Sequence, residues 1–190
     1  IRATGYQRVL SANELEEADS HIREANKNIG KNVPKKDFSR NLQRRNWYQI
    51  KYANAVYAVG EFERPQLRTS EEGEKLFIKG QTQVKGGTGL SVQMAIDNAK
   101  PVFFFNQAEG VWYKWNQGAN KGLGMFTHID APPKPPKRFA GIGTRDINVK
   151  GKQAIQTLFE SNWKPVSTAT EKVARGAKET AKIAKIDELQ

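Results

Sequence analysis

The sequence predicts an α/β fold in which a mostly parallel sheet is flanked by helices, and three stretches support it. Residues 85–105 give a glycine-rich turn, a helix with an apolar stripe and then a short, nearly all-apolar run. Residues 138–159 give an apolar strand, then a second glycine turn and a helix. Residues 55–60 form a further apolar run that ends at glycine. Buried strands alternating with helices are typical of α/β units, and about five strands are expected.

The N-terminal part predicts two helices. Ser11 and Glu14 form the capping-box pattern S-x-x-E, apolar residues follow at helical spacing, and Gly30 is placed to end this helix. His21 falls outside the apolar stripe, so we expect a surface histidine. A second helix is expected from residue 37 or 39 to residue 51.

The second helix contains the run Arg44-Arg45-Asn46-Trp47. Guanidinium groups beside an aromatic ring suit contacts with phosphates and bases, so Arg44, Arg45 and Trp47 are candidate nucleic-acid or partner contacts. The alternative is a solvated helix face with Trp47 in the core. The strand that follows ends at Gly60 and Glu61, and ligands bind at the carboxyl ends of strands in open α/β sheets. Residues 62–80 read as a long loop of the kind that often forms a lid.

The glycine-rich turn predicts an anion site. Lys85, Gly86, Gly87, Thr88 and Gly89 precede an apolar-striped helix, and glycines let bare N–H groups approach a ligand. The first N–H groups of a helix and the positive end of its dipole favour an anion there. A phosphate cradle is therefore one interpretation, and a tight loop without a ligand is the other.

A second glycine turn lies near the C-terminus. After the proline-rich spacer 131–137 comes an apolar strand that breaks into Gly141, Gly143, Thr144 and Arg145, before a helix that starts near Asn148. This order predicts another anion pocket at a helix start, with Arg145 as a charge partner. A strand with alternating aromatic residues is expected at 111–115, and its Trp112 and Trp115 either stack on bases or belong to the core or an interface.

Composition limits the function further. The 190 residues carry a net charge of +11, which favours anionic partners such as nucleic acid, phosphorylated ligands or an acidic assembly. The absence of cysteine excludes disulfides and thiolate chemistry, and two histidines are too few for a histidine-rich metal site. No segment approaches the ~18 apolar residues of a membrane span, and no signal peptide is evident, so we expect a soluble protein. Because the chain starts at Ile1, we expect a processed or truncated N-terminus.

The ordered set of motifs resembles the SLOG superfamily, the Rossmann-like fold of the Lonely Guy enzymes and DNA-processing protein A. It is most similar to the YpsA-like branch found in phages. The resemblance rests on residues 55–60, 86–89 with their helix, 101–105 and 140–145, and it covers roughly residues 39–161. It implies a Rossmann-like domain over residues 1–164, with an Ala/Lys-rich helical tail or docking extension at 165–190.

The resemblance also implies a ligand. In the family the glycine motif and helix start bind the phosphate of a nucleotide or a related molecule. The phosphoribohydrolase branch extends this motif as P-G-G-x-G-T-x-x-E, with a catalytic glutamate, where this chain has Lys85, Leu90 and Gln93. Glutamine cannot act as a general base, so we do not carry the hydrolase activity over.

We therefore expect non-catalytic binding of a nucleotide or nucleotide-derived phosphate, with a nucleotide as the only candidate cofactor and no metal. The alternative is a structural subunit of a larger assembly, a ribonucleoprotein or phage particle, that keeps the fold without the ligand. Partners then include RNA, protein or a second copy of the chain.

Overall fold

The computed structural model describes residues 10–63, 67–69, 75–77, 83–122 and 124–160. The chain divides into two units, Ile1–Ala154 and Ile155–Gln190. Only residues 155–160 of the second unit are described. The predicted helical tail at 165–190, and the predicted boundary before it, lie outside the described residues.

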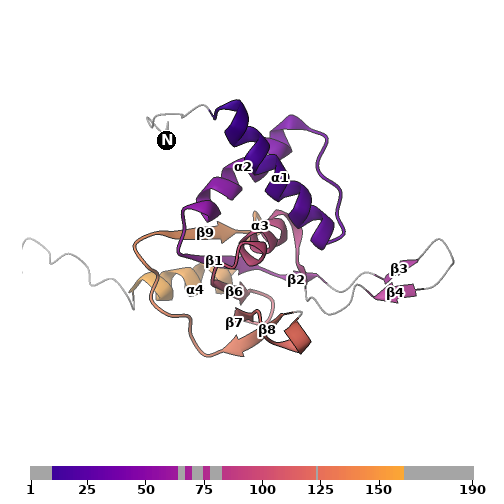
Figure 1. Ribbon diagram of the computed structural model, residues 1–190. Coiled ribbons are helices and arrows are strands. Elements are labelled where there is room, and N and C mark those ends of the chain that lie inside the picture. The colour runs from indigo at the N-terminus through magenta and orange to yellow at the C-terminus, as the bar shows by residue number, and fades with distance from the viewer. Residues whose placement is uncertain (1–9, 64–66, 70–74, 78–82, 123, 161–190) are drawn as a thin grey trace, which may run out of the picture. The chain divides into compact units, whose positions relative to one another are not determined.

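Figure 1 shows the helices and strands along the chain. The described helices are α1 (Ala12–Asn28), α2 (Asp37–Lys51), α3 (Gly86–Asp97), α4 (Val149–Glu160) and the short 3-10 helix η1 (Asn120–Gly122). The described strands are β1 (Ala55–Gly60), β2 (Phe62–Glu63), β3 (Leu67–Thr69), β4 (Lys75–Phe77), β5 (Gln83–Val84), β6 (Val102–Asn106), β7 (Val111–Asn116), β8 (Met125–Ile129) and β9 (Phe139–Gly143).

Five of these strands form one mixed sheet in the order β8-β7-β6-β1-β9. Strand β1 pairs in parallel with β6 and with β9, whereas β7 and β8 join antiparallel. The α/β fold is thus confirmed, but the sheet is mixed, and only three strands are parallel to one another. The reason lies in the four residues between β6 and β7, where Gly110 has φ +84° and its N–H donates to Asn106 O at 2.7 Å. Such a short connection can return only as an antiparallel neighbour.

Two stretches differ from the sequence-based expectation. Strand β8 was not predicted, because two of its five residues are polar and only pairing with β7 defines it. The expected loop 62–80 contains the short strands β2, β3 and β4: β3 pairs with β4, and β2 pairs with β5, which follows the loop.

Helix α1 forms as its sequence predicts. Ser11 and Glu14 make both hydrogen bonds of the capping box, and Gly30 takes φ +64° just beyond the C-cap. The expectation for His21 was wrong, because its ring is half-buried and stacks on Trp47 with centroids 3.6 Å apart.

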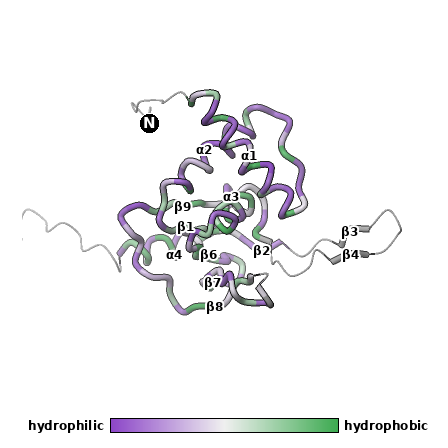
Figure 2. The backbone as a smooth tube through the Cα atoms, in the orientation of Figure 1, coloured by the Kyte–Doolittle hydropathy of each residue, from purple (hydrophilic) through white to green (hydrophobic). Residues whose placement is uncertain are grey.

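Helices α1, α2 and α3 pack against one another, and α3 contacts β1, β6 and β9 (Figure 1). Figure 2 shows the hydrophobic stretches gathered at α3 and the neighbouring strands, while α1 and α2 are mostly hydrophilic. The core therefore lies between α3 and the sheet, with Phe104, Val56 and Met94 fully buried.

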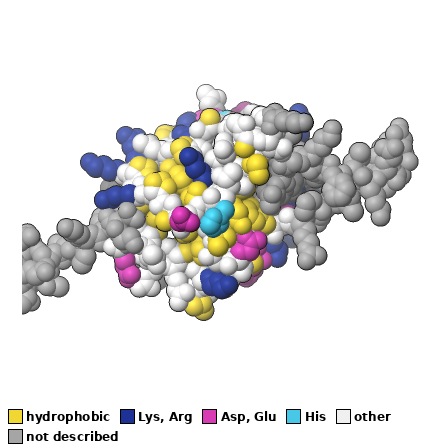
Figure 3. Space-filling model, turned by 90° about the horizontal axis from the view of Figure 1, so that it is seen from below, with side chains coloured by type: hydrophobic (Ala, Val, Ile, Leu, Met, Phe, Trp, Pro, Cys, Tyr) yellow, Lys and Arg dark blue, Asp and Glu magenta, His cyan; other side chains and the backbone are white. Residues whose placement is uncertain are grey.

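The other face of the sheet carries Tyr57 and Val59. Gly151 in the first turn of α4 lies against Val59, where a Cβ would come within 3.0 Å of its Cγ1. Tyr57 donates a hydrogen bond from its hydroxyl to Pro133 O at 3.0 Å, which attaches the proline-rich spacer to this face. Seen from below, toward β7 and β8, hydrophobic side chains cover a broad part of the surface (Figure 3), and Met125 is 42% exposed.

Candidate functional site

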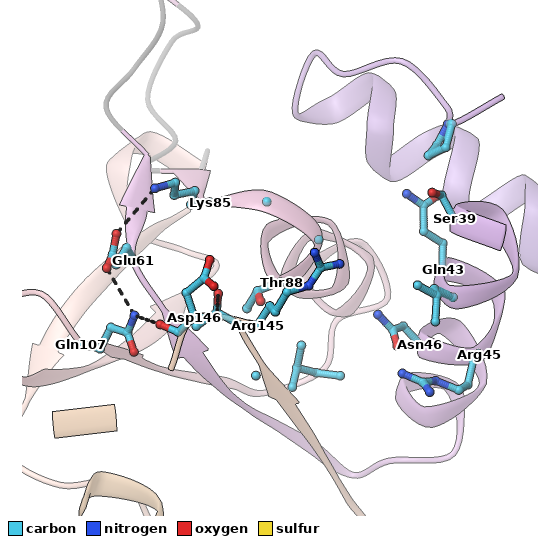
Figure 4. A pocket seen from close by; sticks show the side chains of 17 residues that line it. Ser39, Gln43, Arg45, Asn46, Glu61, Lys85, Thr88, Gln107, Arg145 and Asp146 are labelled. Carbon is cyan, nitrogen blue, oxygen red and sulfur yellow. Dashed lines mark hydrogen bonds and ion pairs between the residues drawn. The ribbon is translucent and has the colours of Figure 1, made fainter. Parts of the chain in front are cut away.

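The carboxyl ends of β1, β6 and β9 meet at one edge of the sheet, because these strands run parallel. A cleft of about 740 Å³ opens there, between this edge, the start of α3 and the side of α2 (Figure 4). Its lining comes from five parts of the chain: residues 34–46, 61, 85–88, 107 and 142–146. These residues are Pro34, Ser39, Leu42, Gln43, Arg45 and Asn46; Glu61; Lys85, Gly86, Gly87 and Thr88; and Gln107, Ile142, Gly143, Thr144, Arg145 and Asp146.

The first turn of α3 presents free donors to this cleft. Within the described residues, the N–H groups of Gly86, Gly87 and Thr88 donate no hydrogen bond, and the first one used is that of Gly89, to Lys85 O at 3.3 Å. Gly86 has φ +67°, a conformation that favours glycine, and a Cβ on Gly87 would meet no atom within 4 Å. Three unpaired N–H groups at the positive end of a helix dipole favour an anion.

The second glycine turn reaches the same cleft. Thr144 donates its N–H to Val59 O at 3.0 Å, which anchors the turn to the end of β1. Arg145 is exposed and has no carboxylate partner among the residues that the structure describes. The helix after this turn does not contribute as predicted, because Asn148 Oδ1 accepts from Gly151 N at 2.9 Å and so caps α4. The turn lines the cleft, whereas the start of α4 is satisfied internally.

The charges around the cleft leave a small positive excess. Arg45, Lys85 and Arg145 stand against Glu61 and Asp146. Lys85 Nζ lies 3.7 Å from Glu61 Oε2, a distance at which the pair is only loosely held. Among the described residues, Arg45 and Arg145 form no ion pair, so these two cations are available to a bound anion.

Helix α2 forms the opposite wall and is tied to the first turn of α3 (Figure 4). Asn46 donates from Nδ2 to Ser91 Oγ at 3.0 Å, and Ser91 donates from Oγ to Gly87 O at 3.2 Å. This wall adds the apolar Leu42 and the amide of Gln43, whose buried Oε1 has no partner in the described part of the chain. Apolar surface with an unpaired acceptor suits a flat heterocycle rather than a second phosphate.

Gln107 is among the cleft residues that the sequence analysis missed, together with Ser39, Leu42, Gln43, Asn46, Ile142 and Asp146. Its Nε2 donates to Asp146 O at 2.9 Å and to Glu61 Oε1 at 3.2 Å, and its Oε1 accepts from Asn148 N at 3.0 Å. Gln107 follows β6 and is only 2% exposed. Its amide thus links the segment after β6 to the segments that follow β1 and β9. The sequence did contain a signal: Asn106 and Gln107 are polar residues directly after an apolar strand, where ligand sites of α/β sheets occur.

Several predicted residues lie outside the cleft. Gly60 is buried at the end of β1, and Gly141 lies in β9, opposite Tyr57. Gly89 has a packing role, since a Cβ there would come within 1.7 Å of Val84 O.

The position that would carry the phosphoribohydrolase glutamate is also outside the cleft. Gln93 donates from Nε2 to Asp97 Oδ1 at 2.8 Å and lines a separate hollow with Glu24 and Asn28. Burial raises the pKa of Asp97, while its hydrogen bonds from Gln93 and Asn28 act in the opposite direction.

Four of the five residues proposed for nucleic-acid or partner contact are engaged elsewhere. Arg44 forms a bidentate ion pair with Asp19 of α1: Nε donates to Oδ1 at 2.7 Å, and Nη2 donates to Oδ2 at 2.5 Å. Trp47 is 3% exposed, so the core alternative holds for it. Trp112 and Trp115 are also buried, at 9% and 8% exposed, and Trp115 donates from Nε1 to Gln117 Oε1. Arg45, the fifth, remains exposed.

The described residues contain no group of three or more histidine, aspartate or glutamate side chains that could hold a metal ion. In the same part of the chain, no helix combines the length and apolar character needed to cross a membrane.

Comparison of the chain with protein-family models, with curated proteins and with solved structures finds no match.

Proposed function

We propose that this protein binds a nucleotide or a nucleotide-derived phosphate in the cleft, without a chemical step. The observation that supports this most directly is the convergence of two glycine turns on one space. Among the described residues, the N–H groups of Gly86, Gly87 and Thr88 and the guanidinium of Arg145 have no partner, and all four residues line this space. Backbone donors and an arginine together are suited to a phosphate group.

The rest of the ligand would lie against α2. Leu42 and Ile142 provide apolar surface, and the amides of Gln43 and Asn46 provide polar atoms at the edge. A cleft of about 740 Å³ has the size of a small-molecule site. Phosphate at the α3 start and a base along α2 would therefore place a mononucleotide across the cleft.

The proposal includes membership of the SLOG superfamily but not its hydrolase activity. A parallel β1–β6–β9 core with a glycine turn before α3 supports that placement. The amide of Gln93 faces Asp97 rather than the cleft, so the family's general base has no counterpart at its motif position.

A thermal-shift series with mononucleotides, dinucleotides and cyclic nucleotides, at low and at high salt, tests the proposal. At a large excess over Kd, a bound nucleotide should raise Tm by about 5 °C or more. The shift should persist at high salt and disappear in Gly87→Asp and Arg145→Gln. Arg138→Gln, which removes an exposed arginine that does not line the cleft, is the matched control and should keep it. If no nucleotide raises Tm in the wild-type protein, the proposal is wrong and the assembly-subunit alternative remains.

A further inference from the structure

The outward face of α2 carries an aromatic side chain at each end and a cation between them. Phe38, Arg45 and Tyr52 follow one another at intervals of seven residues, which is close to two helical turns, so they share one face. Phe38 is 74% exposed and Tyr52 is 52% exposed, which is high for large aromatic residues. Asn41 and Gln49, both exposed, lie on the same face.

Exposed cations extend this face at both ends. Lys35 and Lys36 precede α2 in the chain, and Lys137 and Arg138 line a hollow of about 260 Å³ next to Tyr52. We call these residues the α2 outer face: Lys35, Lys36, Phe38, Asn41, Arg45, Gln49, Tyr52, Lys137 and Arg138.

The cations of the α2 outer face differ from their neighbours in their ion pairs. In the part of the chain that the structure describes, none of its five cations lies in an ion pair. The two other cations toward the end of α2 differ, since Arg44 pairs with Asp19 and Lys51 pairs with Glu17. Arg44 and Lys51 thus hold α1 in place, whereas Arg45 is exposed and forms no ion pair with a described residue.

We propose that the α2 outer face binds single-stranded nucleic acid. Unpaired lysine and arginine side chains attract phosphates, and exposed aromatic rings stack on unpaired bases without regard to sequence. Phe38 and Tyr52 are separated by fourteen residues, or about 21 Å along the helix, which gives room for a short site near the lower end of known lengths, about four nucleotides.

Other partners fit this face less well. A helix that lies on a membrane needs a continuous apolar face, and here Asn41, Arg45 and Gln49 interrupt it. Protein interfaces are depleted in lysine, whereas three of the five cations of this face are lysines: Lys35, Lys36 and Lys137. The face is also distinct from the nucleotide cleft, because Phe38 and Tyr52 do not line the cleft and only Arg45 belongs to both.

Fluorescence anisotropy with labelled oligothymidine and oligouridine tests this proposal on the full chain. Phe38→Ala and Tyr52→Ala should each weaken binding about fivefold or more, because each removes one stacking platform. Lys36→Gln should reduce the slope of log K against log salt by about 0.7, the value for one phosphate contact with a single strand. Lys114→Gln, the same charge change on an exposed lysine of β7, should leave the affinity and the slope nearly unchanged.

Four results would overturn the proposal. The first is the absence of oligonucleotide binding even at low salt, and the second is binding that the Phe38→Ala/Tyr52→Ala double variant retains in full. The third is loss of oligonucleotide binding in Gly87→Asp, which would place the strand in the cleft instead. An acidic polypeptide that binds with the same dependence on Phe38 and Tyr52 would assign the face to a protein partner. Failure of the nucleotide proposal leaves these outcomes unaffected, since neither aromatic lines the cleft.

Discussion

Gln107 Nε2 lies 3.2 Å from Glu61 Oε1, so an amide that follows β6 restrains the carboxylate that follows β1. The same amide group bonds to Asp146 O and the N–H of Asn148, both beyond β9. One buried side chain therefore holds together the three strand ends that form the floor of the cleft.

Replacement of Gln107 should destabilise the protein. In Gln107→Leu the N–H of Asn148 and the carbonyl of Asp146 lose their partner, and we expect the free energy of unfolding to fall by about 2–3 kcal/mol. Urea denaturation measures this. Gln153→Leu, an exposed glutamine of α4, is the control and should change stability by less than about 0.5 kcal/mol. Equal effects of the two substitutions would show that Gln107 does not hold the strand ends.

The glycines of the first turn of α3 should respond differently to alanine. A Cβ on Gly89 would come within 1.7 Å of Val84 O, so Gly89→Ala should cost about 3 kcal/mol or more. A Cβ on Gly87 meets no atom within 4 Å, so Gly87→Ala should leave stability unchanged or raise it by up to about 1 kcal/mol. Urea midpoints of the two variants compare them directly, and a tolerated Gly89→Ala would contradict the close approach of α3 to β5.

The Arg44–Asp19 pair should contribute to resistance against acid. Hydrogen bonds from the Arg44 guanidinium hold the pKa of Asp19 below its ordinary value. The group binds its proton less readily when folded, so its contribution is present above the unfolded pKa of about 3.9 and is lost as the pH falls through the folded pKa. Arg44→Gln should lower the free energy of unfolding at neutral pH by about 1–2 kcal/mol. It should also weaken the loss of stability that accompanies the fall in pH below about 3.9. Urea denaturation at a series of pH values from neutral to acid measures both effects. If the free energy of unfolding falls as steeply with pH in the variant as in the wild type, the prediction is wrong.

His21 should give a second pH dependence, nearer to neutral. Burial against Trp47 lowers the pKa of His21 below 6.5, with smaller effects from Glu17, Lys51 and Asp97. The unfolded chain therefore takes up the proton first as the pH falls. The contribution of His21 to the free energy of unfolding is therefore complete above about pH 6.5 and is lost as the pH falls from there through the folded pKa. NMR titration of the imidazole should give a midpoint below 6.5, and His21→Phe, which keeps a ring on Trp47, should remove this part of the pH dependence.

Local patterns predicted much of the fold. The capping box at Ser11, the glycine turn before α3 and the apolar runs of β1 and β6 each depend on residues close in the chain, so their elements form where expected. The pairing direction of β7 did not follow from its alternating residues, because a strand pattern does not encode its neighbours. The same holds for the candidate cleft. Both glycine turns depend on residues close in the chain and were identified from the sequence, whereas Gln107 and Asn46 reach the cleft through contacts with distant residues and were not.

The sequence by itself determined the positive charge, the α/β class and two glycine turns with an arginine beside the second. Only the tertiary structure decided that the turns share one cleft, since this requires β9 to lie next to β1. It also decided that Arg44 is bound by Asp19 while Arg45 forms no ion pair among the residues that the structure describes, although the two are neighbours in the chain. Side chains one residue apart on a helix point about 100° apart, and which direction meets another element depends on contacts between distant parts of the chain.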